Sequence, residues 1–314
     1  MSSGTDHMKR ARFVRVDVFA KKPFGGNPLA VFPDARGLTG KEMQLLAREM
    51  NLSETTFVVP PTKGSGADFR VRIFTPDMEI AYAGHPTLGT FFVLAREGRI
   101  KLRGLVTTAL MEVKAGVLPV EIHSRNGIVH KVVTVQKPPV FGAVFDAEEV
   151  ADCLSLKKTD LALDRAPVQL VSTGIPWVMV LAKSRAVVEK ASGNTPVFAE
   201  FVKQLPKGAV DIYLTCLDPV DKTSTTHSRG FSLVLGSIVE DPATGSASGC
   251  LGSYLARYKL LPPSAMNRIV NEQGYEMGRP SKIEIEVVSA RDGKTKSVRV
   301  GGPVVHVMDG TAFL

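Results

Sequence analysis

The chain has 314 residues, of which 44% are hydrophobic and 22% charged, a composition typical of a globular protein rather than a disordered one. No stretch approaches the ~18 apolar residues of a membrane span, so we expect no membrane partner. The net charge of +8 could suit nucleic acid, but the basic residues cluster only in pairs and aromatic residues make up 7%, so we expect no nucleic-acid partner and a basic surface that attracts anionic small molecules.

The first residues, MSSGTDHM, look like the remnant of an expression tag, with Met8 as the natural start. No basic and apolar leader follows, and the three scattered cysteines favour a reducing compartment, so we expect a cytoplasmic protein.

Residues 13–20 (FVRVDVFA) alternate like a strand, and residues 29–32 (LAVF) form another after a GGNP turn. Residues 39–42 (TGKE) fit a capping box, which predicts a helix that stops at Asn51.

Two strands and a second helix are predicted next. The strands are SETTFVVP (53–60) and DFRVRIF (68–74), followed by a turn at residues 75–77. Pro86 suits a first helical position, and the residues after it are apolar on nearly every side. A helix that is apolar all round belongs in a core, so we expect a central helix wrapped by strands.

The second helix has a counterpart 161 residues later. Gly84 aligns with Gly245, and residues 94–96 (LAR) align with 255–257 (LAR). The strand at 57–59 has a counterpart in 210–215, and the capped helix has one near 195–202. This ordered repetition predicts two similar halves, each with a core helix that starts in a Gly-polar-small motif.

The predicted fold class is therefore α+β, with two pseudo-symmetric lobes, each a mixed sheet curled around a central helix. We place the N-terminal lobe at residues 9–127, with a join at the turn cluster 124–127, and the C-terminal lobe at 128–302. The closing strand 303–314 is expected to return to the first lobe.

The two helix starts are candidate anion sites. The first N–H groups of a helix have no partner within it and carry partial positive charge, so a carboxylate or phosphate binds well there. Small residues at GHPT (84–87) and TGSAS (244–248) let a ligand approach the backbone. If the two starts face each other, they line an active-site cleft between the lobes.

Nucleotide and metal motifs do not fit the chain. Residues 293–295 (GKT) lack the earlier glycine of a Walker loop and read as a hairpin turn, and no G-x-G-x-x-G follows a strand. No H-x-H, H-E-x-x-H or C-x-x-C pattern occurs, so we expect no metal and no cofactor. Cys153, Cys216 and Cys250 are expected to be small buried residues, and the isolated histidines 123, 130, 227 and 306 to be structural or exposed.

Five stretches together resemble the PhzF-like phenazine-biosynthesis family. They are VDVFAKKPFGGNPLAVF, NLSETTFV, RIFTPDMEIAYAGHPTLGT, EDPATGSASG and EQGYEMGRPSKI, and the resemblance runs in this order from about Phe13 to Ile283. The family shares the diaminopimelate epimerase fold, with the active site between two lobes. Its members are often homodimers, and the resemblance leaves that state open for this chain.

The resemblance implies proton-transfer isomerisation without a cofactor, on a small carboxylated metabolite. The matching general acid/base is Glu54, supported by His85 and Asp241. The substrate-binding positions that match are Asn27, Gly84, Gly245, Ser246 and Ala247. Epimerases of this fold use a cysteine at each helix start, but this chain has Ala83 and Ala243 near those points, and Cys250 lies a full turn into its helix. One carboxylate working on a single face is therefore favoured over a two-thiol racemase.

Plainer roles exist for the same residues. A glutamate at a strand start is usually solvated, a histidine or aspartate near a helix start can act as a cap, and Ser246 can simply pack. The rival functional hypothesis is a small-molecule binding or interaction protein that kept the fold and lost the chemistry. A lyase or hydrolase on the same scaffold is a third possibility.

Overall fold

The computed structural model describes residues 8–206, 208–209, 211–289 and 295–314. The chain divides into two compact units. The first contains residues 8–24, Pro28–Val132 and Val304–Leu314, and the second contains Gly25–Asn27 and Val133–Pro303. Residues 1–7 of the predicted tag remnant, Val210 of the predicted strand 210–215, and Gly293 and Lys294 of the predicted GKT turn lie outside the described residues.

The first unit is built mainly of strands. Its elements are β1 (Arg10–Val18), β2 (Asn27–Phe32), α1 (Gly40–Met50), β3 (Thr55–Val59), β4 (Phe69–Phe74), β5 (Glu79–Ile80), α2 (Gly84–Arg96), β6 (Val106–Val113), β7 (Gly116–Arg125), the start of β8 (Ile128–Gln136), and β18 (Val304–Phe313). Parallel pairs β2–β3 and β4–β6 alternate with antiparallel pairs β3–β4 and β6–β7. The first predicted strand ends two residues early because Phe19 takes a left-handed φ of 66°.

Helix α1 forms where its local signals predict. The Thr39 side chain accepts a hydrogen bond from the Glu42 N–H, and the Glu42 carboxylate accepts one from the Thr39 N–H, so both halves of the capping box are present. Asn51 ends the helix in the left-handed conformation. The buried face of the helix, with Met43 and Leu46, joins a core cluster that includes Phe32, Phe57 and Phe74.

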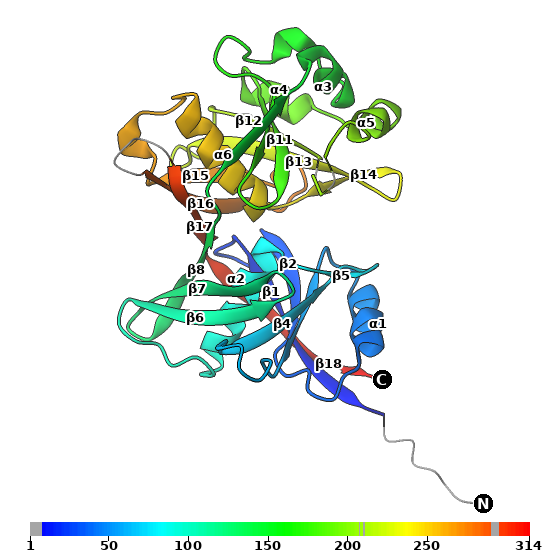
Figure 1. Cartoon of the computed structure of the whole chain (residues 1–314), viewed down its shortest axis with the longest axis vertical. Helices are drawn as coiled ribbons and strands as arrows, with labels where there is room; N and C mark the ends of the chain where they lie inside the picture. The colour runs from blue at the N-terminus through cyan, green and yellow to red at the C-terminus, as the bar shows by residue number, and fades with distance from the viewer. Residues whose placement is uncertain (1–7, 207, 210, 290–294) are drawn as a thin grey trace, which may run out of the picture. The chain divides into compact units, whose positions relative to one another are not determined.

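Helix α2 is the predicted central helix of the first unit. It packs against β1, β3, β7 and β18, and Figure 1 shows it lying among the strands of this unit. The helix begins at Gly84, so Pro86 is its third residue and not its first, which corrects the prediction. The position still suits proline, because N–H groups in the first turn have no partner within the helix.

The second unit repeats the plan of the first. Its elements are the end of β8, β9 (Val140–Val144), α3 (Ala147–Cys153), a 3₁₀ turn (Lys158–Asp160), β10 (Gln169–Ser172), β11 (Pro176–Leu181), α4 (Arg185–Lys190), α5 (Thr195–Val202), β12 (Asp211–Cys216), β13 (Thr226–Val234), β14 (Ser237–Asp241), α6 (Gly245–Arg257), a 3₁₀ turn (Pro263–Ala265), β15 (Ile269–Gln273), β16 (Ser281–Ser289) and β17 (Thr295–Gly302). Parallel pairs β11–β12 and β13–β15 again alternate with antiparallel pairs β12–β13 and β15–β16.

The two central helices have the same length and the predicted offset. Helices α2 and α6 each have 13 residues, and their bounds are offset by the predicted 161 positions. Helix α6 packs against β10, β11, β16 and β17. In the second unit β9 pairs with β10, and in the first unit the closing strand β18 pairs with β1, both antiparallel, as predicted for residues 303–314.

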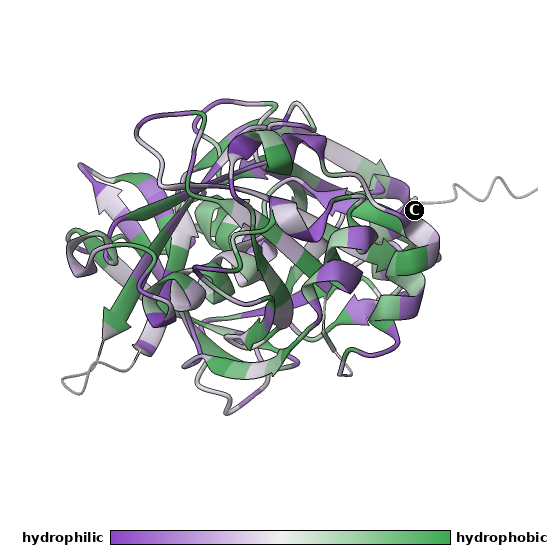
Figure 2. Ribbon diagram, turned by 90° about the horizontal axis from the view of Figure 1, so that it is seen from above, coloured by the Kyte–Doolittle hydropathy of each residue, from purple (hydrophilic) through white to green (hydrophobic). Residues whose placement is uncertain are grey.

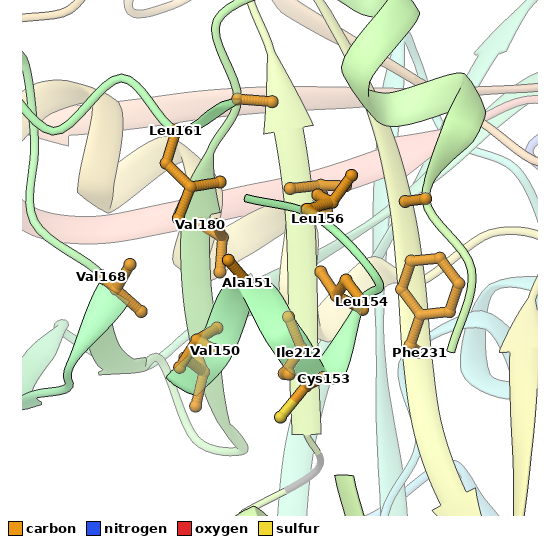
Figure 3. Packing of buried hydrophobic residues seen from close by; sticks show 14 of the residues in the cluster. Val150, Ala151, Cys153, Leu154, Leu156, Leu161, Val168, Val180, Ile212 and Phe231 are labelled. Atoms are coloured by element: carbon orange, nitrogen blue, oxygen red, sulfur yellow. The ribbon is translucent and has the colours of Figure 1, made fainter. Parts of the chain in front are cut away.

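Buried apolar side chains hold each unit together. In the second unit, residues from α3 and from strands β11, β12 and β13 form one cluster, in which Val150, Leu154, Val180, Ile212 and Phe231 point toward one another (Figure 3). Hydrophobic and hydrophilic residues alternate along the ribbons in Figure 2, as expected for elements with one buried face. All three cysteines are buried and free, as predicted.

Candidate functional site

The side chain of the predicted general acid/base, Glu54, lies beside His85 in the first turn of α2. Glu54 directly precedes β3, whose neighbour β4 leads through β5 to the helix, so the local chain path brings residues 54 and 85 together. The Glu54 Oε2 atom lies 3.4 Å from His85 Nε2, and their side chains are 17% and 8% exposed. Glu54 is therefore not a solvated surface residue.

His85 is electrically neutral in this environment. Burial disfavours the charged imidazolium and lowers the pKa of His85 to about 3. The contact with Glu54 is consequently a polar contact and not an ion pair at neutral pH. Among the described residues, His85 Nε2 has no hydrogen-bond partner of standard geometry. A buried polar atom in that condition is expected to have a further partner, such as water or a ligand.

The start of α2 has no cap from its own N-cap residue. Ala83 is the residue before the helix, and its methyl side chain cannot bond the first N–H groups. Gly84 is the first helical residue, with no acidic residue in the first turn. The positive end of the helix dipole is thus not neutralised by a carboxylate within the helix itself.

The second unit holds Asp241 at the start of α6. Asp241 is the last residue of β14, and its Oδ1 accepts a hydrogen bond from Asn27 Nδ2 at 2.8 Å. Its Oδ2 accepts one from the Thr244 hydroxyl at 2.5 Å. Burial raises the pKa of Asp241 to about 6, although these two hydrogen bonds act in the opposite direction. The carboxyl group therefore ionises close to neutral pH.

The remaining predicted binding residues occupy the first turn of α6. Gly245, Ser246 and Ala247 are its first three residues, and the Ser248 N–H is bonded to the Thr244 carbonyl at 3.0 Å. The three preceding N–H groups come before this bond, at the positive end of the helix. Ser246 is partly exposed, and its hydroxyl oxygen accepts a hydrogen bond from the indole of Trp177 at 3.1 Å.

Gln273 holds the residues before α6 in place through hydrogen bonds, a role that the sequence analysis did not predict. Its Oε1 accepts hydrogen bonds from the Thr244 N–H at 2.9 Å and from the Tyr213 hydroxyl at 2.7 Å. Its Nε2 donates to the Asp241 carbonyl at 2.7 Å and to the Thr244 hydroxyl at 2.8 Å. The only signal in the sequence was its place in the EQG segment, to which no role was attached. No sequence motif indicated that Trp177 would contact a predicted site residue.

Cys250 does not behave as a catalytic thiol. It lies in the second turn of α6, fully buried, and burial raises its pKa to about 11.

Within the described ranges there is no group of three or more His, Cys, Asp or Glu side chains placed to hold a metal ion. None of the helices in those ranges is long and apolar enough to cross a membrane.

A cavity of about 460 Å³ lies elsewhere in the first unit. Arg12, Arg36 and Arg99 line it together with Phe69 and Glu97. None of the predicted site residues lines this cavity, and Glu97 and Arg99 follow the C-terminal end of α2, opposite His85. The helix starts, and not this cavity, therefore hold the candidate chemistry.

Comparison with known proteins agrees with the fold. Residues 16–310 match the model of the phenazine biosynthesis-like protein family, PhzC-PhzF. Over 96% of this chain and 99% of the relative, the sequence is 33% identical to the trans-2,3-dihydro-3-hydroxyanthranilate isomerase of Pseudomonas aeruginosa. An uncharacterized isomerase of Clostridium acetobutylicum is also 33% identical, over 98% of this chain and 99% of that relative.

Solved structures give the same result. A PhzF-family protein of Bacillus anthracis has a TM-score of 0.86 and 32% identity, with 98% of this chain and 100% of that chain covered. A proline racemase-like protein of Agrobacterium radiobacter, at 14% identity and a TM-score of 0.65 over 96% and 92% of the two chains, shares the fold alone. The predicted resemblance and the predicted α+β fold class are confirmed. The chain therefore belongs to the PhzC-PhzF family of phenazine biosynthesis-like proteins and is an enzyme of the isomerase type.

Proposed function

We propose that this enzyme moves a proton between carbon atoms of a small carboxylated metabolite, without a cofactor, with Glu54 as the general acid/base. The observation that carries the proposal is the Glu54 carboxylate beside the neutral His85 imidazole, both largely buried, at the first turn of α2. A proton donor or acceptor must reach the reacting atom directly, and enclosure of the pair supports that use.

The chemistry needs a base and a place for negative charge. Glu54 takes a proton from one carbon, its carboxyl group exchanges that proton with water, and it delivers a proton to another carbon, so no net redox change or loss of atoms occurs. The N–H groups at a helix start stabilise negative charge on a substrate. Gly84 offers such a group at α2, and Gly245 and Ala247 offer them at α6 together with the hydroxyl of Ser246. His85 hydrogen-bonds as an uncharged ring, and Asp241, with its pKa near 6, serves as a second acid or base.

The substrate class is argued from the relatives. The P. aeruginosa relative is named for trans-2,3-dihydro-3-hydroxyanthranilate, which carries a ring carboxylate. A carboxylate suits the positive end of a helix and a serine donor, which are features of the α6 start. This compound is the first substrate to test, followed by other small carboxylated metabolites.

The decisive experiment is turnover in deuterated water. We expect the product to gain one deuterium and otherwise keep the mass of the substrate, and Glu54→Gln to lower turnover by a factor of about 10² to 10⁴. Glu49→Gln, an exposed glutamate on α1, is the matched control and should leave turnover unchanged. Undiminished turnover in Glu54→Gln rejects the assignment. Carboxylate binding that is indifferent to Glu54, without exchange, supports the alternative of a binding protein, and a changed product mass supports a lyase or hydrolase.

A further inference from the structure

The hydroxyl of Ser246 differs from three other hydroxyls of the two central helices and resembles that of Ser248, which accepts a hydrogen bond from Asn271 Nδ2 at 3.1 Å. Thr87, Thr90 and Ser253 each donate to the carbonyl four residues earlier, at 2.9, 2.7 and 3.1 Å. Ser246 instead accepts the indole proton of Trp177 at 3.1 Å. An indole N–H can only donate, so the serine oxygen is the acceptor in this pair and its own proton is left for another partner.

Trp177, the donor of this hydrogen bond, is buried and packed against an aromatic neighbour. Trp177 is the second residue of β11 and only 2% exposed. Its ring lies edge-to-face against Tyr213, with centroids 5.9 Å apart. The Tyr213 hydroxyl in turn donates to Gln273, the residue that holds the turn before α6. A buried ring packed against Tyr213 cannot turn its N–H away from Ser246 without disturbing this packing.

We propose that Trp177 is a positioning residue that makes Ser246 a hydrogen-bond donor toward an anionic group of the ligand. The inference rests on the proposed function, in which the start of α6 receives the substrate carboxylate. Because the indole occupies one of the two acceptor lone pairs of the serine oxygen, and the helix start carries partial positive charge, a ligand group that offers only donors, such as an ammonium, is disfavoured there. Trp177, together with the positive helix end, thereby favours a carboxylate over a positively charged group without touching the ligand.

The hydrogen bond itself can be measured without any ligand. The chain contains one tryptophan, so its indole N–H gives a single nuclear magnetic resonance signal. Ser246→Ala keeps the ring buried but removes the acceptor, and we expect indole proton exchange to become about ten-fold faster. Exchange at the same rate in the wild type and in Ser246→Ala would overturn the inference.

The effect on ligand binding is tested with benzoate, and with benzylamine as the cationic probe. Benzoate should bind the wild type and benzylamine should not, and Trp177→Phe and Ser246→Ala should each weaken benzoate binding by about ten-fold. The double variant should be no weaker than either single variant, because both changes remove one shared interaction. Tyr254→Phe, which also loses a buried hydrogen bond on α6, is the control and should bind benzoate normally.

Additive losses in the double variant, or equal binding of benzoate and benzylamine, would contradict a positioning role. If Trp177→Phe fails to fold, the exchange rate in Ser246→Ala still decides whether the hydrogen bond exists. Neither readout involves turnover. Failure of the Glu54 experiment would thus leave these results standing, and failure here would leave the role of Glu54 intact.

Discussion

The side-chain amide of Asn27 donates a hydrogen bond to Asp241 Oδ1 at 2.8 Å, although 214 positions separate the two residues. The same nitrogen also donates to the Ala243 carbonyl at 3.0 Å. Asn27 therefore ties the end of β14 to the loop before α6. Burial raises the pKa of Asp241 to about 6, and the bonds from Thr244 and Asn27 moderate that rise because they favour the charged carboxylate.

We predict that Asn27→Ala raises the pKa of Asp241 above its wild-type value, because one donor to the carboxylate is lost. Carbon-13 resonance titration of the aspartate carboxyls measures this, with Asp241→Asn used to assign the signal. Asn194→Ala, which removes an asparagine at the start of α5, is the control and should leave the titration unchanged. An unaltered or lower pKa in Asn27→Ala would contradict the prediction.

The same group has a predicted effect on stability. Its folded pKa lies above the ordinary 3.8, so the folded state binds the proton more tightly than the unfolded chain does. The contribution of Asp241 to the free energy of unfolding is greatest below pH 3.8 and is lost as the pH rises through about 6. Asp241→Asn should flatten this part of the stability curve in urea unfolding.

A second pH-sensitive group lies in the core of the second unit. His227 on β13 contacts Glu272 through Nδ1 at 3.4 Å and Glu276 through Nε2 at 2.8 Å. Burial alone would lower the pKa of His227, but the hydrogen bonds and charges of the two glutamates outweigh it and raise the pKa to about 9. His227 is thus charged at neutral pH, in contrast to His85.

We predict that the free energy of unfolding falls between pH 6.5 and about 9 as His227 loses its proton. The folded pKa is the higher one, so the stabilisation is complete below 6.5 and is lost as the pH rises through the folded value. His227→Gln should be less stable at pH 6.5 and show a flatter curve in this window. A wild-type curve that stays level from pH 6.5 to 9.5, beyond the folded pKa, would show that the ion pairs do not contribute.

The parts of the fold that the sequence predicted are those encoded locally. Helix α1 follows from Thr39 and Glu42 at its start and Asn51 at its end, all within 13 residues. The match between α2 and α6 followed from a repeated motif at a fixed offset, because a repeated sequence needs a repeated core. Glu54 and His85 are brought together by a short β3–β4–β5 path, of which β3 and β4 were predicted and β5 was not.

Contacts made across long sequence distances could not be predicted in this way. Nothing near Asn27 indicates that it bonds Asp241, and nothing near Trp177 points to Ser246. Gln273 makes its four hydrogen bonds because β15 pairs in parallel with β13, a topology that depends on the whole unit. The two-residue error at Pro86 arose because proline is compatible with several first-turn positions, so it does not fix which residue comes first.

Close packing of α6 on β16 depends on Gly252. A Cβ atom there would lie 2.6 Å from Ile285 Cγ2 and 3.1 Å from Val287 Cγ2, both buried branches that the sheet holds in place. In an exposed helix, a change from glycine to alanine stabilises by about 1 kcal/mol. Overpacking of a core costs about 1–3 kcal/mol, so the balance at this position should be unfavourable.

We predict that Gly252→Ala lowers the free energy of unfolding by about 1–2 kcal/mol, measured by urea unfolding. Ile285→Ala removes the nearest obstructing atom, so adding Gly252→Ala to that variant should be neutral or stabilising, and the two changes should be strongly non-additive. Glu49→Ala on the exposed face of α1 is the control and should change stability by less than about 0.5 kcal/mol. If Gly252→Ala is equally destabilising with and without the Ile285 side chain, close approach to β16 is not the reason that glycine is needed here.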